Sequence, residues 1–258
     1  MASCSASKGT PRRLTSGTGG TISRARYAAA VTRPTVLLFD VDGTLVSCGG
    51  AGRAAMKAAL RELAPSDEAL DFPFAGGTDR SIARRALAGS SLADDDASIE
   101  AFIARYLSHL PAQLEASPGY RVLDGVGAIL DALEGRERYA IGLGTGNVER
   151  GARLKLARGG LDDRFHFGGF GCDHEERPRL IAAGAARGAA RLGVAVDDCR
   201  VVVIGDTLRD VDAARAIGAE CVGVGTGPIE AAALREAGAT VAFDDLRAAG
   251  VLTALISQ

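Results

Sequence analysis

Two hydrophobic patterns alternate through the second half of this 258-residue chain, and few folds accommodate such an order. Short apolar runs, RYAIGLGTGN, RVVVIGD, ECVGVGTG and ATVAFDD, are typical of buried strands. Between them, VERGARLKLARGG, RPRLIAAGAARGAARLG, LRDVDAARAIG and PIEAAALREAG carry apolar residues at the three- and four-residue spacing of helices. This alternation predicts an α/β fold, a Rossmann-like, doubly wound parallel sheet with helices on both faces.

The first strand of the predicted sheet is TVLLFD, residues 35–40, and a helical block then interrupts the alternation. Three segments with helical spacing make up the block: RAAMKAALREL, DRSIARRALAG and ASIEAFIARYLSHLPAQLEA. We therefore expect a small α-helical domain at residues 52–120, inserted into a core formed by residues 35–51 and 121–258. The glycines of CGGAG, residues 48–52, can absorb the dihedral changes of a hinge between the two parts.

Charge is distributed unevenly along the chain. Residues 1–39 carry six basic residues and no acid. Since the whole chain has a net charge of −2, the remaining residues carry −8, which argues against nucleic acid or an anionic membrane as the main partner. Residues 1–34 are rich in Ser, Thr, Gly and Arg, and we interpret them as a disordered basic tail. An organelle transit peptide has a similar composition and is the alternative.

Cysteine spacing and hydropathy bear on the cellular compartment. The five cysteines are scattered, without a CxxC pair or a histidine at zinc spacing, which suits reduced thiols. No run approaches the ~18 apolar residues of a membrane span, and the N-terminus shows no secretory h-region. We therefore expect a cytoplasmic protein, with organelle targeting by the tail as the alternative. No sequence pattern predicts an oligomeric state.

Polar residues gather at the ends of three predicted strands. They are Asp40 and Asp42 after the first, Thr145, Gly146 and Asn147 after the second, and Asp206 and Asp210 after a later one. Because parallel strands end at the same edge of a sheet, we expect these residues to converge. Clustered carboxylates repel one another unless a cation lies between them. Magnesium prefers oxygen ligands, usually one or two carboxylates with water and substrate phosphate, and is the cofactor we expect.

Three motifs, FDVDGTL, GLGTGN and IGDTLRD, resemble in this order the signature of the haloacid dehalogenase superfamily. The similarity covers residues 36 to about 245, and the helical block resembles the cap of the phosphoglycolate phosphatase and β-phosphoglucomutase-like subgroup. It implies a magnesium-dependent phosphatase that hydrolyses a small phosphorylated metabolite, a phosphate monoester, through an aspartyl phosphate. A phosphomutase of the β-phosphoglucomutase type and a non-catalytic regulatory module on the same fold are the alternatives.

The resemblance also implies roles for the acidic residues. Asp40 is then the nucleophile that attacks phosphorus, and Asp42 is the acid that protonates the leaving oxygen and later deprotonates water. Asp40, the carbonyl of Asp42, and Asp206 would hold magnesium, with Asp210 as a further ligand or as an orienter of the site. An acid at position 42 favours rapid hydrolysis, since dehalogenases of the superfamily lack one there and the transport ATPases carry threonine.

By the same resemblance, the hydroxyl of Thr145 and the N–H of Gly146 bind the phosphoryl oxygens. The family's usual lysine, in an SKP-like loop, is replaced here by the sequence EERPRL, in which Arg177 precedes proline. Lys155 is the other candidate for the phosphate-binding cation. It lies roughly two turns into its helix, at ~1.5 Å per residue, whereas Arg177 is nearer the strand edge but has a different shape. The sequence leaves this choice open.

FAGGTDRSI, residues 74–82, is the loop of the helical block most suited to contact a substrate. Its two glycines permit close approach, and Thr78, Asp79 and Arg80 offer polar contacts. A role for Thr78 or Asp79 as the N-cap of a helix explains the same residues. The sequence favours neither interpretation.

Overall fold

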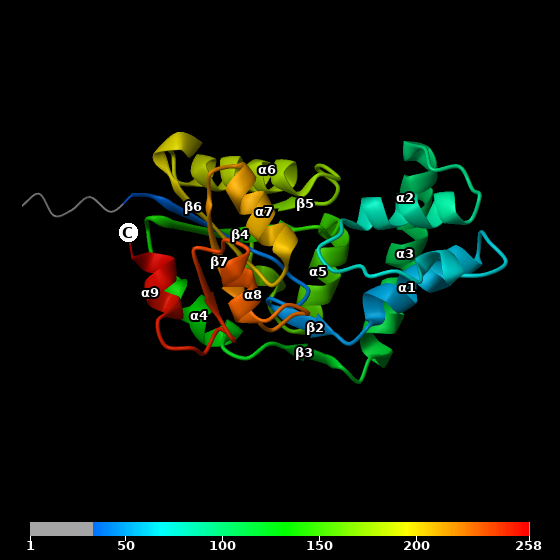
Figure 1. The fold of residues 1–258 in the computed structure, drawn as a ribbon, viewed down its shortest axis with the longest axis horizontal. Helices are drawn as coiled ribbons and strands as arrows, with labels where there is room; N and C mark the ends of the chain where they lie inside the picture. Colours follow the sequence, from blue (N-terminus) through cyan, green and yellow to red (C-terminus); the bar gives the residue numbers. More distant parts are fainter. Residues whose placement is uncertain (1–32, 258) are drawn as a thin grey trace, which may run out of the picture. The chain divides into compact units, whose positions relative to one another are not determined.

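A computed structural model of the chain describes residues 33–257 (Figure 1). Apart from Arg33 and Pro34, the predicted basic tail therefore lies outside the described residues. Within residues 33–257, no helix is long and apolar enough to cross a membrane.

In the described region, the main sheet has six parallel strands in the order β5-β4-β1-β6-β7-β8. They are β1 (Thr35–Phe39), β4 (Tyr139–Thr145), β5 (Gly168–Phe170), β6 (Arg200–Gly205), β7 (Glu220–Val224) and β8 (Val241–Phe243). Thr35 of β1 pairs with Tyr139 of β4 on one side and with Arg200 of β6 on the other. Because the strands run in the same direction, the loops after β1, β4 and β6 meet at one edge. The α/β, Rossmann-like fold predicted from the sequence is confirmed.

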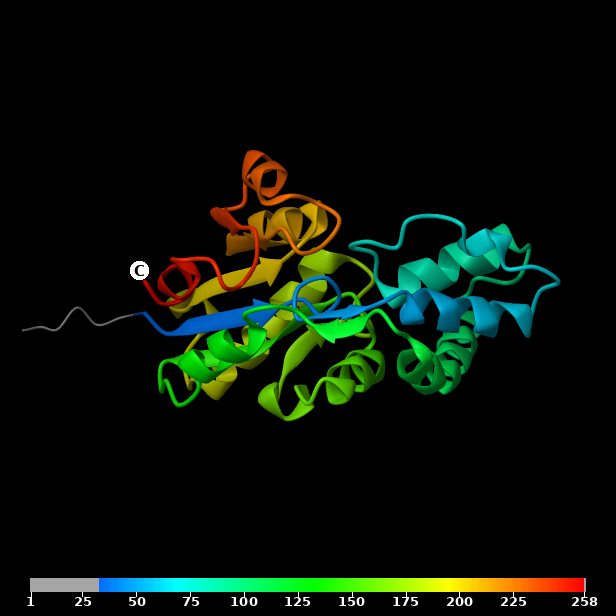
Figure 2. The same cartoon turned by 90° about the horizontal axis from the view of Figure 1, so that it is seen from below.

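Helices cover both faces of the sheet (Figures 1 and 2). Alternate residues of β1 show the two faces, since Val36 and Leu38 belong to one hydrophobic core and Leu37 and Phe39 to another. The first core lies under α6 (Arg177–Arg191), α7 (Leu208–Ala216) and α8 (Ala231–Glu236), and the second under α4 (Val126–Leu133), α5 (Glu149–Arg158) and α9 (Val251–Ile256). Burial of both faces explains why the strands are almost continuously apolar.

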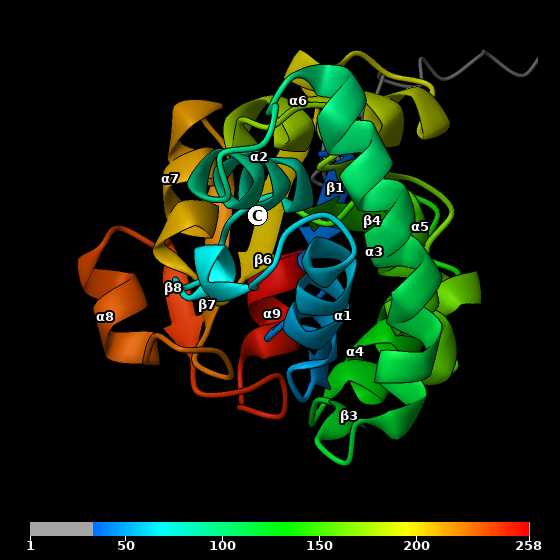
Figure 3. The same cartoon turned by 90° about the vertical axis from the view of Figure 1, so that its right-hand side faces the viewer.

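Three helices lie beyond the carboxyl ends of the strands, namely α1 (Ala51–Arg61), α2 (Asp79–Gly89) and α3 (Asp96–Ala116). Figure 3 is seen from that side and shows them in front of the sheet. Met56 of α1 and Phe102 of α3 belong to the same buried cluster. The antiparallel strands β2 (Val46–Cys48) and β3 (Tyr120–Val122) carry the chain into and out of these helices. The predicted helices are present, and their assignment to a separate domain at 52–120 stays a prediction.

The sequence patterns do not predict α4, α9, the three-residue strand β5 or the β2–β3 ribbon. The segment of α4, VGAILDAL, is almost wholly apolar, so it shows no helical periodicity. The two ribbon strands have three residues each and pair across the whole helical block, which no local pattern reveals. Three single turns complete the described elements: η1 (Glu68–Leu70), η2 (Asp162–Arg164) and η3 (Val196–Asp198).

Candidate active site

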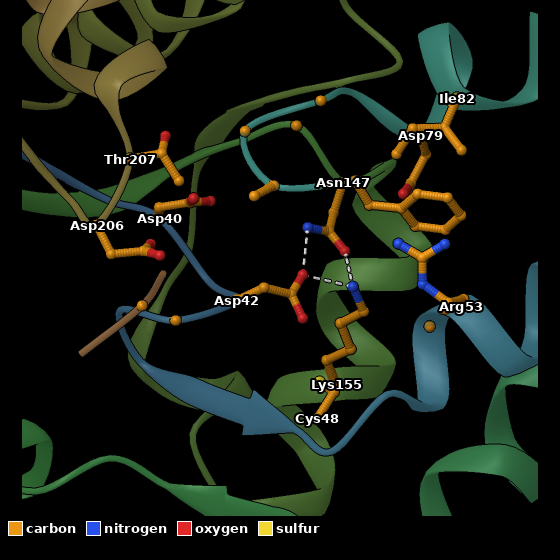
Figure 4. Close-up of a pocket in the computed structure, with 18 of the residues that line it drawn as sticks. Asp40, Asp42, Cys48, Arg53, Asp79, Ile82, Asn147, Lys155, Asp206 and Thr207 are labelled. Atoms are coloured by element: carbon orange, nitrogen blue, oxygen red, sulfur yellow. Dashed lines mark hydrogen bonds and ion pairs between the residues drawn. The ribbon is translucent and has the colours of Figure 1, made fainter. Parts of the chain in front are cut away.

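The loop after β1 brings Asp40 and Asp42 to the carboxyl edge of the sheet (Figure 4). Asp40 is 5% exposed, and its Oδ1 accepts a hydrogen bond from the Val41 N–H at 2.8 Å. Gly43 follows with a φ of +84°, and a Cβ at this position would lie 2.3 Å from Oδ2 of Asp206. Glycine therefore allows both the left-handed turn and the close approach of the loop to Asp206.

Asp40, Asp206 and Asp210 form an acidic cluster in which one carboxylate oxygen of each lies within 4.8 Å of the others. Asp206 accepts a hydrogen bond from the Thr44 hydroxyl at 3.0 Å, and Asp210 accepts two from Thr207, at 3.0 Å from N–H and 2.7 Å from the hydroxyl. Burial and repulsion by the other two carboxylates raise the pKa of Asp206 well above its ordinary value. A divalent cation would relieve this repulsion, and three hard carboxylate ligands fit one.

Arg177 lies among these acids. Its Nη2 is 2.7 Å from Oδ2 of Asp40 and 2.5 Å from Oδ1 of Asp210. Arg177 begins α6 with proline next in sequence, which places it at the strand edge, and it is 6% exposed. Burial opposes its charge, but Asp210 and Asp40 outweigh this and raise the pKa of the guanidinium. Among the described residues, its buried Nε–H has no hydrogen-bond partner, so this donor is available to a ligand.

Lys155, on α5, contacts the other aspartate of the loop. Its Nζ lies 2.5 Å from Oδ2 of Asp42 and donates a hydrogen bond to Oδ1 of Asn147, whose Nδ2 in turn donates to Oδ2 of Asp42 at 2.9 Å (Figure 4). Burial would raise the pKa of Asp42, but Lys155 and Asn147 outweigh it and lower that pKa. The Asp42 side chain is 42% exposed, so a ligand can reach it. Lys155 thus forms its ion pair with Asp42, whereas Arg177 forms ion pairs with Asp40 and Asp210.

The loop after β4 joins the strand edge to the helical block. Oγ1 of Thr145 accepts hydrogen bonds from the N–H of Asn147 at 3.3 Å and from its Nδ2 at 3.0 Å, which leaves the hydroxyl proton free to be donated. The Gly146 carbonyl accepts a hydrogen bond from the Asp79 N–H at 2.8 Å. A Cβ at Gly146 would lie 2.4 Å from the Gly77 carbonyl oxygen, so only glycine permits this approach.

Thr78, Asp79 and Arg80 have three different surroundings. Thr78 is the N-cap of α2 and accepts a hydrogen bond from the backbone N–H three residues on. Asp79 lines the cavity described below; its Oδ2 accepts a hydrogen bond from the Val148 N–H at 2.9 Å, and burial raises its pKa to about 6. Arg80 forms an ion pair with Glu100 and is not among the residues that line the cavity.

A cavity of about 390 Å³ lies between the strand edge and the helical block. Asp40, Asp42 and Asp206 line its sheet side. Its opposite wall comes from the helical block, through Arg53, Met56, Phe74, Asp79, Ile82 and Tyr106. The volume is near the lower end for ligand pockets, roughly 300–1,000 Å³, so it suits a small molecule.

The sequence interpretation assigns no role to Arg53 or Tyr106 of this wall. A signal for both was present, because each occupies a position of an otherwise apolar helical stripe. Arg53 precedes Met56 by three residues on α1, and Tyr106 follows Phe102 by four on α3. When an apolar face of a helix borders a cavity, a polar side chain on that face is a candidate contact for a ligand.

The family profile of the haloacid dehalogenase-like hydrolases matches residues 34–218, which contain the loops after β1, β4 and β6. The chain belongs to this family. The resemblance to this family that the three sequence motifs indicate is therefore confirmed for the hydrolase. No curated protein sequence matches it significantly.

Solved structures share the fold of this hydrolase. One is a predicted phosphoglycolate phosphatase from Haemophilus somnus, with 20% identity, a TM-score of 0.63, and coverage of 86% of this chain and 97% of that one. Another is a protein assigned as a β-phosphoglucomutase from Thermotoga maritima, with 23% identity, a TM-score of 0.55, and coverage of 86% and 98%. A third is CbbY from Rhodobacter sphaeroides, solved in complex with phosphate, with 18% identity, a TM-score of 0.64, and coverage of 85% and 98%. At these identities the likeness establishes the fold of the hydrolase.

Proposed function

We propose that the chain is a magnesium-dependent phosphatase that hydrolyses a small phosphate monoester through an aspartyl phosphate on Asp40. The observation that carries the proposal is the different surroundings of two aspartates two residues apart. Asp40 lies in the acidic cluster beside Arg177, whereas Asp42 faces the cavity beside Lys155. One carboxylate thus has the charge-neutralising neighbours that a nucleophile needs, and the other is accessible as a proton carrier.

The proposed reaction has two steps. In the first, an oxygen of Asp40 forms a bond to phosphorus, the ester P–O bond breaks, and Asp42, which enters the step protonated, donates its proton to the leaving oxygen. In the second, water attacks phosphorus, Asp42 accepts the proton of the water, and the bond between Asp40 and phosphorus breaks. Inorganic phosphate leaves and both aspartates return to their initial states. Lys155 and Asn147 hold Asp42 in place for both proton transfers.

We assign the phosphoryl oxygens to three donors at the strand edge: the Thr145 hydroxyl, the Gly146 N–H and the Nε–H of Arg177. The Nε–H of Arg177 has no hydrogen-bond partner in residues 33–257, and its Nη2 contacts Asp40; both observations support Arg177 as the phosphate-binding cation. Lys155 is then a positioning residue for Asp42. In phosphoryl transfer, most of the rate acceleration comes from hydrogen-bond donors that are already in position to stabilise the charge of the transition state.

The proposed magnesium site is the acidic cluster, with the carboxylates of Asp40 and Asp206 and the carbonyl of Asp42 as protein ligands. Asp210 contacts both Arg177 and Thr207, so it either orients the cluster or supplies a further ligand. A bound magnesium ion would supply positive charge next to the phosphoryl group.

We further propose that residues 52–120 act as a cap over the site. The hydrogen bond from Asp79 to Gly146 supports this proposal, because it holds the loop before α2 against the phosphate-binding loop. Exclusion of water by a cap would strengthen the electrostatic interactions inside. A cytoplasmic location is part of the proposal, and the four cysteines of the described region, Cys48, Cys172, Cys199 and Cys221, are free thiols.

The test is phosphate release from a panel of small esters, including phosphoglycolate, sugar phosphates and nucleoside monophosphates, with magnesium and with a chelator. Asp40→Asn is the decisive variant, and Asp212→Asn is the matched control because that aspartate is exposed on α7. We expect magnesium-dependent release by the wild type and the control, and none above background by Asp40→Asn.

Three outcomes would refute the proposal in different ways. Full turnover by Asp40→Asn would rule out an aspartyl phosphate on Asp40 as the intermediate. Isomerisation of a hexose 1-phosphate faster than phosphate release would replace the phosphatase by a phosphomutase. Release from none of the esters would favour a non-catalytic module on the same fold.

A further inference from the structure

We propose that Arg53 and Tyr106 form a subsite for a second anionic group, a carboxylate or a second phosphate, on the leaving group of the substrate. The inference rests on the proposed function and deepens it, since it names the class of ester that the site selects. It assigns this selection to the helical wall of the cavity, which the reaction steps do not use.

Arg53 presents a fixed cation to the cavity. Its Nη1 and Nη2 donate hydrogen bonds to the carbonyls of Leu70 at 2.6 Å and Phe72 at 2.8 Å, and its guanidinium lies 3.7 Å from the centre of the Phe74 ring. Three of its five N–H groups remain for a ligand. Because these contacts hold the side chain in place before a ligand arrives, binding costs little conformational entropy.

No carboxylate of the described residues forms an ion pair with Arg53, in contrast to the two other cations that line the cavity. Lys155 is neutralised by Asp42, and Arg177 by Asp40. Figure 4 shows Arg53 across Asn147 and Lys155 from Asp40, so an anion on Arg53 would be the far end of a molecule whose phosphate lies at Asp40. A planar guanidinium matches carboxylate and phosphate oxygens in two parallel hydrogen bonds.

Tyr106 is an independent observation that points to the same wall. It is 0% exposed and lines the cavity, and among the described residues its hydroxyl has no hydrogen-bond partner. Leaving a buried hydroxyl unpaired costs about 1–3 kcal/mol, so such groups are normally satisfied by a ligand or by water. An oxygen of the leaving group would accept this hydrogen bond.

Asp79 also faces the cavity and limits where the anion can bind. Its Oδ2 is occupied by the Val148 N–H at 2.9 Å, on the side of the cavity nearest the phosphate-binding loop. An anionic group is therefore favoured beside Arg53 and disfavoured beside Asp79. A neutral leaving group could accept hydrogen bonds from Arg53 but would form no ion pair with it.

The experiment compares paired esters that differ in the charge of the leaving group. Phosphoglycolate is paired with 2-hydroxyethyl phosphate, and propane-1,3-diol bisphosphate with the monophosphate of the same diol. The measured quantity is the ratio of kcat/KM for the anionic member to kcat/KM for the neutral member. The first pair tests for recognition of a carboxylate, and the second pair tests for recognition of a second phosphate. The two pairs therefore show which anionic group the subsite binds.

We expect wild type to prefer the anionic member of one pair or both. Arg53→Gln is expected to lower this ratio by roughly 10–100-fold, as for loss of a hydrogen-bonded charge. Tyr106→Phe is expected to lower it by about 2–10-fold, as for one neutral donor. Arg85→Gln is the matched control, because Arg85 also lies over an aromatic ring, that of Phe72 at 3.9 Å, but does not line the cavity. It should leave the ratio unchanged.

Two results would overturn the inference while the proposed function stands: equal kcat/KM for both members of each pair in the wild type, or a ratio that Arg53→Gln and Tyr106→Phe leave intact. If Arg53→Gln fails to fold, Tyr106→Phe decides alone, since it removes only a hydroxyl that has no hydrogen-bond partner in the part of the chain that the structure describes. Failure of the wild type to release phosphate from any ester, p-nitrophenyl phosphate included, would overturn the proposed function itself.

Discussion

Replacement of Asp79 by asparagine is expected to stabilise the protein at neutral pH. Asp79 is 6% exposed, and burial raises its pKa from an ordinary 3.8 to about 6. Since one pKa unit corresponds to 1.36 kcal/mol, the charged carboxylate destabilises the folded state by about 3 kcal/mol at pH 7. Asparagine retains an oxygen that can accept the hydrogen bond from the Val148 N–H and carries no charge.

The sign of the effect follows from the protons bound in each state. Below about pH 4 the carboxyl is protonated in both the folded and the unfolded protein, so its charge costs nothing. As the pH rises towards 6, the unfolded state loses the proton first, and the wild type becomes less stable relative to the variant. Above about pH 6 both states are ionised, and the difference stays constant at about 3 kcal/mol.

Urea unfolding of Asp79→Asn and of the wild type at pH 4, 5, 6 and 7 measures this difference. About half of it is expected near pH 5. Asp212→Asn is the control, since its exposed carboxyl should give no such trend. A difference that does not change with pH, or a variant less stable than the wild type at pH 7, would refute the reasoning.

Arg177→Met is expected to lower kcat for phosphate release by roughly 10²–10³-fold, because it removes a preorganised donor beside the nucleophile. Lys155→Met is expected to move the limb of the pH–rate profile set by Asp42 to higher pH, because the cation that lowers the pKa of Asp42 is then absent. Gly146→Val, whose Cβ would lie 2.4 Å from the Gly77 carbonyl oxygen, is expected to cost about 1–3 kcal/mol in urea unfolding. Magnesium at 100 times its Kd is expected to raise the free energy of unfolding by about 2.7 kcal/mol, reversibly with chelator.

Each of these outcomes has a result that contradicts it. If the Arg177→Met protein were as active as the wild type, Lys155 rather than Arg177 would be the phosphate-binding cation. An unchanged pH profile in Lys155→Met would mean that Lys155 does not act through Asp42. Gly127→Val is the control for Gly146→Val, because a Cβ at Gly127 meets no atom of the described residues within 4 Å. A melting temperature unaffected by magnesium would contradict the proposal that the acidic cluster binds magnesium.

Local patterns were sufficient to predict five of the six strands of the sheet and its edge. A strand of a parallel sheet buried on both faces must be apolar along its length, and its first polar residue marks its end. Asp40, Thr145 and Asp206 each occupy such a position. The direction of parallel strands then brings these ends together without any knowledge of side-chain contacts. The elements that escaped prediction, such as the β2–β3 ribbon, depend on pairing between segments about 70 residues apart.

By itself, the sequence determined the α/β fold, the order of most of its strands and helices, and the acidic edge, because strand and helix periodicity and parallel strand direction are local or topological properties. Only the tertiary structure separated the contacts of Lys155 from those of Arg177 and revealed that Arg53 has no ion-pair partner among residues 33–257. Those facts concern single atoms a few ångströms apart on helices that are distant in the sequence. Their distances depend on how the helices pack and which rotamers the packing allows, and periodicity carries no information about either.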